Sequence, residues 1–262
     1  MNYLLAEPQK EIIKKAYSGK FTHPQISYLF DETEMPELKE TGPVLLCDNT
    51  TDEQTLKQLL QKNAGLLITS RHSKEDILAQ LRHNLFVYFK PDQIGIFRYY
   101  DPFIASYFFP SLSEQETADW LGPIQSIQWY NANWRDKATQ SDHWQSHTNP
   151  AAKDWQLNAE HLKTKPVLTN NQNLALQDMQ QEKFAYHWQQ SAHKNPNQIN
   201  IDSIILWVKQ GIRDGFISEY DLNRYLSLRA QYPTVKAPTQ WPSQEIEDKI
   251  IYLQYYLQTA AS

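Results

Sequence analysis

Short apolar runs alternate with helical patterns along residues 1 to about 130 of the chain. Runs of four to six mostly apolar residues, bounded by polar or turn-forming residues, are typical of strands. The pattern predicts strands at residues 3–6, 26–30, 44–47, 66–69, 85–89, 94–99 and 124–129. Between them, apolar residues recur three and four positions apart, as at Leu56, Leu59 and Leu60, which is the spacing of one helix face. We therefore expect helices packed on a sheet.

Local signals refine this N-terminal pattern. The runs LFVYFK and IGIFRYY are joined by a short Pro-Asp-Gln segment and predict an antiparallel hairpin, so we expect a mixed sheet. Ser73 with Asp76, and Ser113 with Glu116, match the capping box. In that motif a hydroxyl and a carboxylate bind backbone N–H groups at the start of a helix. These carboxylates are therefore predicted to be structural.

The chain changes character after residue 130. Residues 131–170 are rich in Asn, Gln, Ser and charged residues but carry Trp134, Trp144 and Trp155, which predicts a polar, Trp-containing connector. Residues 171–262 show apolar stripes at helical spacing: Ile201, Ile204, Ile205, Val208 and Ile212; Leu222, Tyr225, Leu226 and Arg229; and Ile246, Ile250, Leu253 and Leu257. The predicted fold is a two-lobed α/β (α+β) protein, with a mixed sheet and packed helices in residues 1–130 and a helical lobe in residues 171–262.

Composition and charge narrow the possible partners. The 262 residues are 40% hydrophobic and 21% charged, which is typical of a folded globular protein. The net charge is −5 and no basic stripe occurs, so we expect no nucleic-acid partner. No apolar run approaches the roughly 18 residues that a membrane helix needs, so no membrane insertion is expected. Cys47 is the only cysteine, which excludes an intrachain disulfide, and a cytoplasmic location is predicted.

The least ordinary segment is residues 94–123, which read IGIFRYYDPFIASYFFPSLSEQETADWLGP. Arg98 and Asp101 in this segment could bind an anion or act as acid and base. A structural role is favoured, because Asp101 can cap a helix whose first residue is Pro102, where no N–H is needed. Arg98 can pair with that carboxylate. If the pair is buried, loss of one partner would cost about 3–5 kcal/mol.

Catalytic signatures are weak in this sequence. His143 and His147 have the i, i+4 spacing of two metal ligands on a helix, but Trp144 stands where the HExxH motif needs a glutamate. Cys47 lies in an apolar run, which predicts a buried thiol with a raised pKa. We predict no cofactor, no metal and no enzymatic activity. Two alternatives stay open: a metal- or carboxylate-dependent hydrolase, and a small-ligand sensor with its pocket between the lobes.

The segment FRYYDPFIASYFFPSLSEQETADWLGPI resembles a motif of the type VI secretion effector chaperones, also called adaptors. The matching residues are Arg98, Tyr100, Asp101, Pro102, Pro110, Leu112, Gly122 and Pro123. The resemblance covers about residues 3–130, and residues 171–262 look like the more variable helical part found in many members. Trp120-Leu121 is a departure, since an aromatic residue more often directly precedes Gly-Pro in the family.

This resemblance implies a cytoplasmic protein without enzymatic activity. It would bind one cognate type VI effector and help to load that effector onto the VgrG/PAAR spike of the secretion machine. The family likeness assigns no catalytic role to Arg98 or Asp101, so they are expected to belong to a structural motif. Its members are Arg98, Tyr100, Asp101, Pro102, Gly122 and Pro123.

An adaptor of this kind must cover apolar surface of its client. The C-terminal lobe carries more aromatic residues than one narrow helix face can bury, and aromatic residues dominate binding hot spots. The predicted partner-binding residues are Trp188, Trp207, Phe216, Tyr220, Tyr225, Trp241, Tyr252 and Tyr256. The alternative is that most of them form the lobe's own core and its seam with the N-terminal lobe. Deletion of residues 171–262 is expected to abolish client capture.

Overall fold

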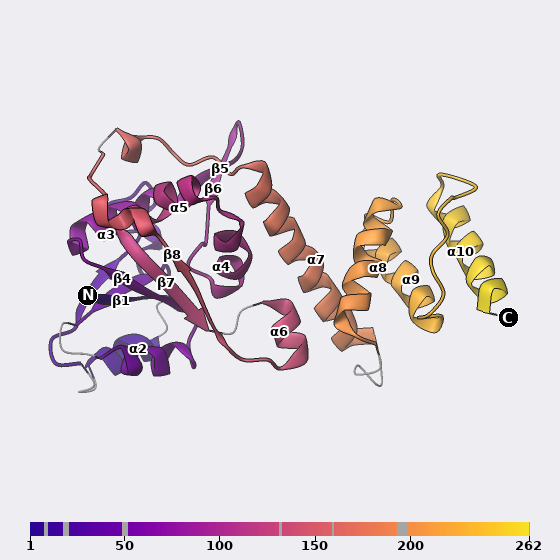
Figure 1. The fold of residues 1–262 in the computed structure, drawn as a ribbon, viewed down its shortest axis with the longest axis horizontal. Helices are drawn as coiled ribbons and strands as arrows, with labels where there is room; N and C mark the ends of the chain where they lie inside the picture. Colours follow the sequence, from indigo (N-terminus) through magenta and orange to yellow (C-terminus); the bar gives the residue numbers. More distant parts are fainter. Residues whose placement is uncertain are drawn as a thin grey trace. The chain divides into compact units, whose positions relative to one another are not determined.

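The fold is taken from a computed structural model, which describes residues 1–7, 10–17, 21–48, 52–130, 133–158, 160–192 and 199–261 (Figure 1). Residue 131, where the predicted connector begins, and residue 262 lie outside the described residues. The chain divides into two compact units, Met1–Gln177 and Asp178–Ser262. This division falls within α7 (Asn170–Ala192), which begins one residue before the predicted helical lobe. No helix in the described ranges is long and apolar enough to cross a membrane.

A six-stranded sheet organises unit 1. Its strands are β1 (Asn2–Ala6), β2 (Gln25–Tyr28), β3 (Val44–Cys47), β4 (Gly65–Ser70), β7 (Ile124–Tyr130) and β8 (Trp144–Thr148). The order across the sheet is β2-β3-β1-β4-β7-β8, and each neighbouring pair is antiparallel. The predicted α+β class, with helices following the sheet in a C-terminal helical region, is therefore confirmed, but this sheet is antiparallel and not mixed.

The position of β1 between β3 and β4 explains why the sheet is antiparallel and not mixed. The helix α2 (Glu53–Leu60) connects β3 to β4, and these two strands run in the same direction. They are not neighbours, because β1 pairs with both of them: Leu4 lies opposite Leu46 of β3 and Leu67 of β4. A helical crossover in the sequence indicates that two strands are parallel, but it does not reveal that a third strand separates them.

The predicted hairpin is present as β5 (Phe86–Lys90) and β6 (Gln93–Ile96), which pair in antiparallel fashion. It forms a separate two-stranded sheet and does not join the six-stranded one. Tyr88 on β5 instead bonds to a distant segment: its N–H donates to the carbonyl of Pro166 at 2.8 Å, and its carbonyl accepts from the N–H of Leu168 at 3.2 Å.

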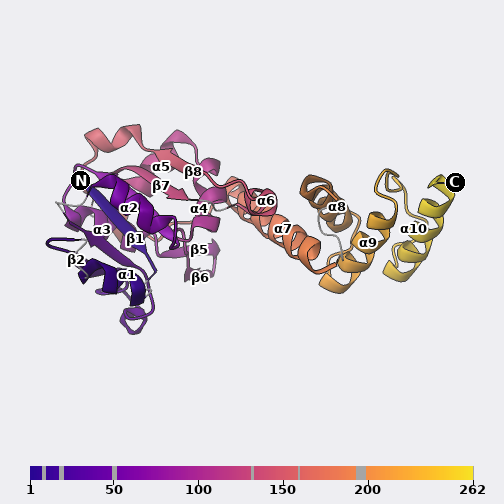
Figure 2. The same cartoon turned by 90° about the horizontal axis from the view of Figure 1, so that it is seen from below.

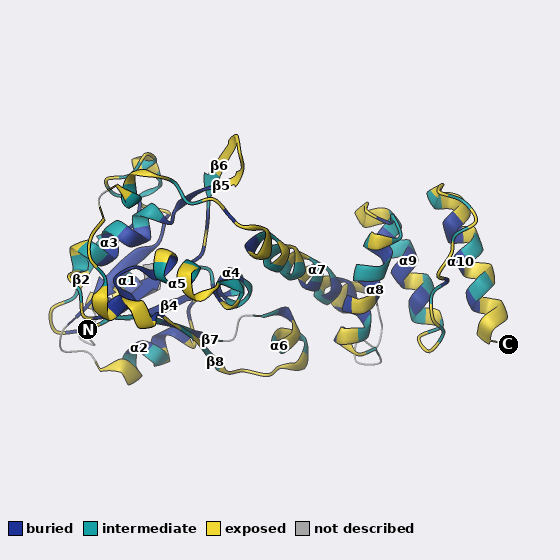
Figure 3. Ribbon diagram, turned by 45° about the horizontal axis from the view of Figure 1, so that its top comes forward, coloured by how far each residue is buried: buried dark blue, intermediate teal, exposed yellow. Residues whose placement is uncertain are grey.

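Helices cover both faces of the six-stranded sheet. Because side chains alternate along a strand, Tyr3 and Leu5 of β1 point to one face and Leu4 and Ala6 to the other. The first face is covered by α3 (Lys74–His83), α4 (Pro102–Phe108) and α5 (Glu114–Leu121), and the second by α1 (Lys10–Lys15) and α2. The helix α2 lies in front of the sheet in Figure 2, and Figure 3 shows the buried strands between the helical layers.

The segment predicted as a connector contains regular structure. Within residues 133–158 and 160–170 lie α6 (Trp134–Thr139), β8, and the short 3-10 helices η4 (Pro150–Asp154) and η5 (His161–Lys163). The 3-10 helices η2 (Pro36–Leu38) and η3 (Phe109–Ser111) lie earlier in the described part of the chain. Strand β8 extends the sheet beyond β7, with Ile127 opposite His147. This part of the chain therefore contributes a strand to unit 1.

Unit 2 consists of the later part of α7 with α8 (Ile201–Arg213), α9 (Glu219–Gln231) and α10 (Ile246–Ala261). The predicted apolar stripes form its interior, with Ile204, Leu226 and Leu253 fully buried. Gly211 allows α8 and α9 to approach closely, because a Cβ at this position would lie only 2.7 Å from Leu222 Cδ1.

Candidate functional site

Asp101 begins α4 in the predicted manner. Its Oδ1 accepts a hydrogen bond from the N–H of Phe103 at 2.9 Å, and its backbone is extended. Pro102 follows as the first helical residue, where its missing N–H leaves no bond unmade. The carboxylate of Asp101 is therefore used as a helix cap.

The pair of Arg98 with Asp101 is present but is not buried. Its guanidinium bonds to Glu7 and lies 3.8 Å from Asp101 Oδ2, but its side chain is 49% exposed. The guanidinium also lies 5.9 Å from the centre of the Tyr100 ring. Solvent screens an ion pair this exposed, so the condition for a cost of several kcal/mol is not met. We expect an effect below about 1 kcal/mol on loss of Arg98.

The aromatic residues around this pair form the core of unit 1. Phe108 packs edge-on against Phe97 at 4.7 Å and against Trp120 at 4.6 Å between ring centres. The hydroxyl of Tyr99 donates to the carbonyl of Leu81 at 2.7 Å. Burial raises the pKa of Tyr100 to about 12, so its phenol stays neutral around pH 7. The segment thus supports the fold through apolar packing and neutral hydrogen bonds.

Gly122 and Pro123 fix the end of the motif. Gly122 has φ of 50°, and a Cβ there would collide with the side chain of Gln80. Gln80 is buried and donates through Nε2 to the carbonyls of Asp119 and Trp120 at 3.0 and 3.1 Å. The carbonyl of Pro123 accepts from Ser70 Oγ at 2.6 Å. Glycine at 122 is therefore required both by the backbone conformation and by the space that Gln80 fills.

The histidines do not form the helical pair that a metal site would need. His147 lies in β8, where its Nε2 bonds to Thr117 Oγ1 at 2.9 Å and burial lowers its pKa. His143 precedes the strand and lies 3.6 Å from Asp136. Four residues of extended chain separate two side chains by about 13 Å, too far for one metal ion. No group of three or more His, Cys, Asp or Glu among the described residues could hold a metal ion.

Cys47 is the buried thiol that the sequence predicts. It is buried in β3, and this burial raises the pKa of the thiol. A thiol held in its protonated form is a poor nucleophile.

Four of the predicted partner-binding residues are interior. Trp188, Trp207, Phe216 and Tyr225 are each exposed by 4% or less, so they cannot contact a partner in this conformation. Phe216 packs on Tyr225 with 4.9 Å between ring centres. The burial of these four residues corresponds to the alternative of a core role.

The other four predicted residues reach the surface of unit 2. Tyr220 is 69% exposed, and Trp241, Tyr252 and Tyr256 are half-buried. The three half-buried rings follow one another, with 6.2 Å between Trp241 and Tyr252 and 6.1 Å between Tyr252 and Tyr256. The structure thus brings three predicted residues together beside α10 and leaves Tyr220 on α9.

Two further exposed residues of α10 extend this surface: the sequence pointed to Tyr255 only as one of the surplus aromatic residues, and it missed Ile251. Ile251 and Tyr255 lie one turn apart on α10 and are 66% and 68% exposed. They flank Tyr252 and Tyr256, and we call these four residues the α10 apolar face. The signal was present in the sequence, because Ile251 and Tyr255 lie off the stripe of Ile250, Leu253 and Leu257 on a helical wheel.

Comparison with known families concerns unit 1. Residues 2–119 match the family model described as a domain of unknown function (DUF4123). The matched range includes β1 to β6 and most of the Arg98–Pro123 motif. Neither the curated proteins nor the solved structures contain a match to the chain. The matched family is associated with type VI secretion effector adaptors.

Proposed function

We propose that this protein is an adaptor for one cognate type VI secretion effector. It binds the effector in the cytoplasm and promotes loading of the effector onto the VgrG/PAAR spike, without catalysis. The observation that carries this proposal is the match of residues 2–119 to a family associated with such adaptors. The capping role of Asp101 and the packing of the surrounding aromatic residues agree with a scaffold role for unit 1.

Client binding is assigned to the α10 apolar face. An exposed side chain loses water contact when a partner covers it, and each buried Å² of apolar area contributes about 25 cal/mol before association costs. Ile251 and Tyr255 have the most area left to bury on α10, and Tyr252 and Tyr256 widen the face. Aromatic residues of this kind are frequent at binding hot spots.

The test is co-purification of the full chain with the effector encoded beside it. The double variant Ile251→Glu/Tyr255→Glu places two charges on the α10 apolar face, and we expect capture to fall at least tenfold. Gln254→Glu is the matched control, because Gln254 is an exposed polar residue of the same helix. Circular dichroism checks that both variants keep their helical content.

A second control addresses the apolar surface of unit 1. Ile94 on β6 is 48% exposed, and Phe89 on β5 is 37% exposed. Ile94→Glu carries the same kind of substitution on this hairpin, and we expect it to keep capture. Loss of capture with Ile94→Glu and not with the α10 variant would move the client site to unit 1. Failure of every adjacent effector to co-purify with the unaltered chain would contradict the adaptor function itself.

A further inference from the structure

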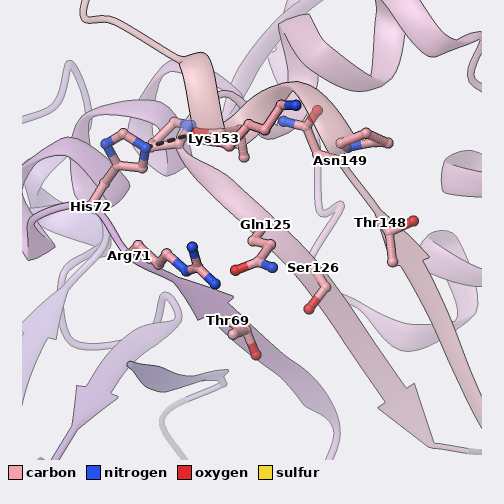
Figure 4. Close-up of a pocket in the computed structure, with 11 residues that line it drawn as sticks. Thr69, Arg71, His72, Gln125, Ser126, Thr148, Asn149 and Lys153 are labelled. Carbon is pink, nitrogen blue, oxygen red and sulfur yellow. Dashed lines mark hydrogen bonds between the residues drawn. The ribbon is translucent and has the colours of Figure 1, made fainter.

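A concavity of about 620 Å³ lies on the sheet of unit 1 and takes no part in the proposed adaptor function. Its floor is formed by the ends of β4, β7 and β8 and its wall by η4 (Figure 4). The volume lies within the range of about 300–1,000 Å³ that is usual for small-molecule sites. Its lining residues come from three separate parts of the chain, residues 69–72, 123–126 and 148–153.

Three hydroxyl side chains cross the floor in register. Thr69 of β4 lies opposite Ser126 of β7, and Ser126 lies opposite Thr148 of β8. Since alternate residues share a face, Thr69 points to the same side of the sheet as Leu67, the side that α1 and α2 cover elsewhere. Among the described residues, Ser126 and Thr148 make no side-chain hydrogen bond. Thr69 Oγ1 donates to Asn2 Oδ1 at 3.0 Å, so Thr69 can still accept from a ligand, whereas Ser126 and Thr148 can both donate and accept.

The charges that line the concavity are positive. Arg71 and Lys153 contribute to its lining, and among the described residues no Asp or Glu does. Figure 4 shows the guanidinium of Arg71 directed toward Gln125 and Ser126. Arg71 forms no ion pair with any residue in the described ranges. The ammonium of Lys153 lies 3.8 Å from Asp154, but both side chains are at least 75% exposed, so this pairing leaves Lys153 able to bind another anion.

The walls of the concavity are held by buried hydrogen bonds. Asn149 is buried, and its Nδ2 donates to the carbonyl of Gly122 at 3.0 Å. Ser70 is also buried and accepts from the N–H of His72 at 3.1 Å. The ring of His72 bonds to the carbonyl of Ala152 through Nε2 at 2.8 Å, the dashed contact in Figure 4. A site that is already ordered loses little conformational entropy when a ligand binds.

We propose that this concavity binds a small polar organic anion. Its carboxylate or phosphate group lies beside Arg71 and Lys153, which offer charge-assisted hydrogen bonds. Its hydroxyl or amide groups lie along Thr69, Ser126 and Thr148. A single inorganic anion would use only the cationic part of the site, so the organic anion is expected to bind more tightly than inorganic phosphate.

The test is titration of the isotope-labelled full chain, followed through backbone amide chemical shifts. The probes are glucose 6-phosphate, glucuronate, glucose and inorganic phosphate. We expect localised shifts at Thr69, Ser126 and Thr148 with a charged sugar, and weaker binding of inorganic phosphate. Binding of glucose 6-phosphate alone would identify a phosphate ligand, and binding of glucuronate alone a carboxylate ligand. Glucose binding as tightly as both charged sugars, or no localised shift with any probe, would overturn the proposal.

Matched variants distinguish the contribution of the cations to ligand binding from that of the hydroxyl groups. Arg71→Gln and Lys153→Gln should each weaken binding of the charged sugar about tenfold, the loss of one charge-assisted hydrogen bond. Lys90→Gln is the control, because Lys90 is an exposed cation of unit 1 that does not line the concavity. Ser126→Ala should weaken the charged sugar but leave inorganic phosphate unchanged. Equal affinities for Arg71→Gln, Lys153→Gln and Lys90→Gln would show that the cations do not form the site.

Discussion

Each unit contains an aromatic cluster, and the two clusters differ in whether they extend to the protein surface. In unit 1, Phe97, Phe108 and Trp120 surround one another and are all buried. In unit 2, a row begins at Phe216 with no exposure and continues through Trp241, with 5.6 Å between their ring centres. The row then reaches the half-buried Tyr252 and Tyr256 of α10.

This difference separates residues that stabilise the fold from residues that can bind. A buried ring contributes to the free energy of unfolding through packing on every side. A ring at the surface still has area to bury against another protein. Composition does not distinguish the two cases, because both clusters consist of Phe, Tyr and Trp. Burial of each ring is the quantity that does.

We expect the largest difference in the free energy of unfolding between Phe108→Ala and Tyr255→Ala. Phe108 is fully buried, so its truncation should lower the free energy of unfolding by about 3–5 kcal/mol through lost packing and a new cavity. Tyr255 is 68% exposed, and its truncation should change stability by no more than about 0.5 kcal/mol. Urea unfolding followed by circular dichroism measures both. Comparable losses would mean that Tyr255 packs inside unit 2.

The strands of unit 1 were predictable where apolar residues form uninterrupted runs. Val44–Cys47 is buried along its whole length, and the sequence VLLC shows this directly. Trp144–Thr148 was not predicted as a strand, because WQSHT is an edge strand with no buried residue and mostly polar side chains. The strand order was not predictable either, since the pairing of β1 with β3 and β4 depends on contacts distant in sequence.

The two candidate sites were predictable to different degrees. The α10 apolar face lies within one helix, so its aromatic residues stood out in the sequence, and the position of Ile251 off the apolar stripe could have revealed it. The concavity of unit 1 left no local signal. Arg71, Ser126 and Lys153 are ordinary polar residues in three separate segments, and only the register of β4, β7 and β8 brings these segments together.

We expect a smaller difference in stability between variants of Asp101 and Arg98, the polar pair beside the aromatic cluster of unit 1. Asp101→Ala should cost about 1 kcal/mol, because the N–H of Phe103 loses its cap. Arg98→Ala should cost less than this, since its ion pairs are half-exposed. Asp101→Asn is the control that keeps a capping side chain. Thermal unfolding measures all three variants.

Client capture shows whether this pair is only structural. We expect the Arg98 and Asp101 variants to capture the client as the unaltered chain does, in contrast with the α10 variant. A stable Arg98→Ala protein that fails to capture the client would place Arg98 on the interface. The comparison between a structural unit 1 and a binding unit 2 would then no longer hold.

The smallest expected effect is the pH dependence of stability that Glu116 causes. Glu116 accepts hydrogen bonds at the starts of two helices of unit 1, α5 and α7. The N–H of Ser113 donates to Glu116 Oε2 at 2.8 Å, and Thr169 Oγ1 and Gln172 Nε2 donate to Oε1 at 2.9 and 3.0 Å. These bonds hold the pKa of Glu116 below its usual value, and the bond from the Ser113 backbone has the largest effect. The folded state therefore favours the ionised carboxylate. Its stabilising effect is complete above the unfolded pKa of about 4.3 and is lost as pH falls through the lower folded pKa.

Solvent limits this effect to no more than about 1 kcal/mol, because the carboxylate is partly exposed. Glu116→Gln should lower stability near neutral pH and reduce the loss of stability on acidification. Glu114→Gln is the matched control, since Glu114 lies in the same first turn of α5 and makes no side-chain hydrogen bond among the described residues. Unfolding free energies measured in urea from pH 3 to 7 compare the two variants, with the usual carboxylate range as the window. If both variants show the same pH dependence, the bonds from Ser113, Thr169 and Gln172 do not stabilise the ionised Glu116.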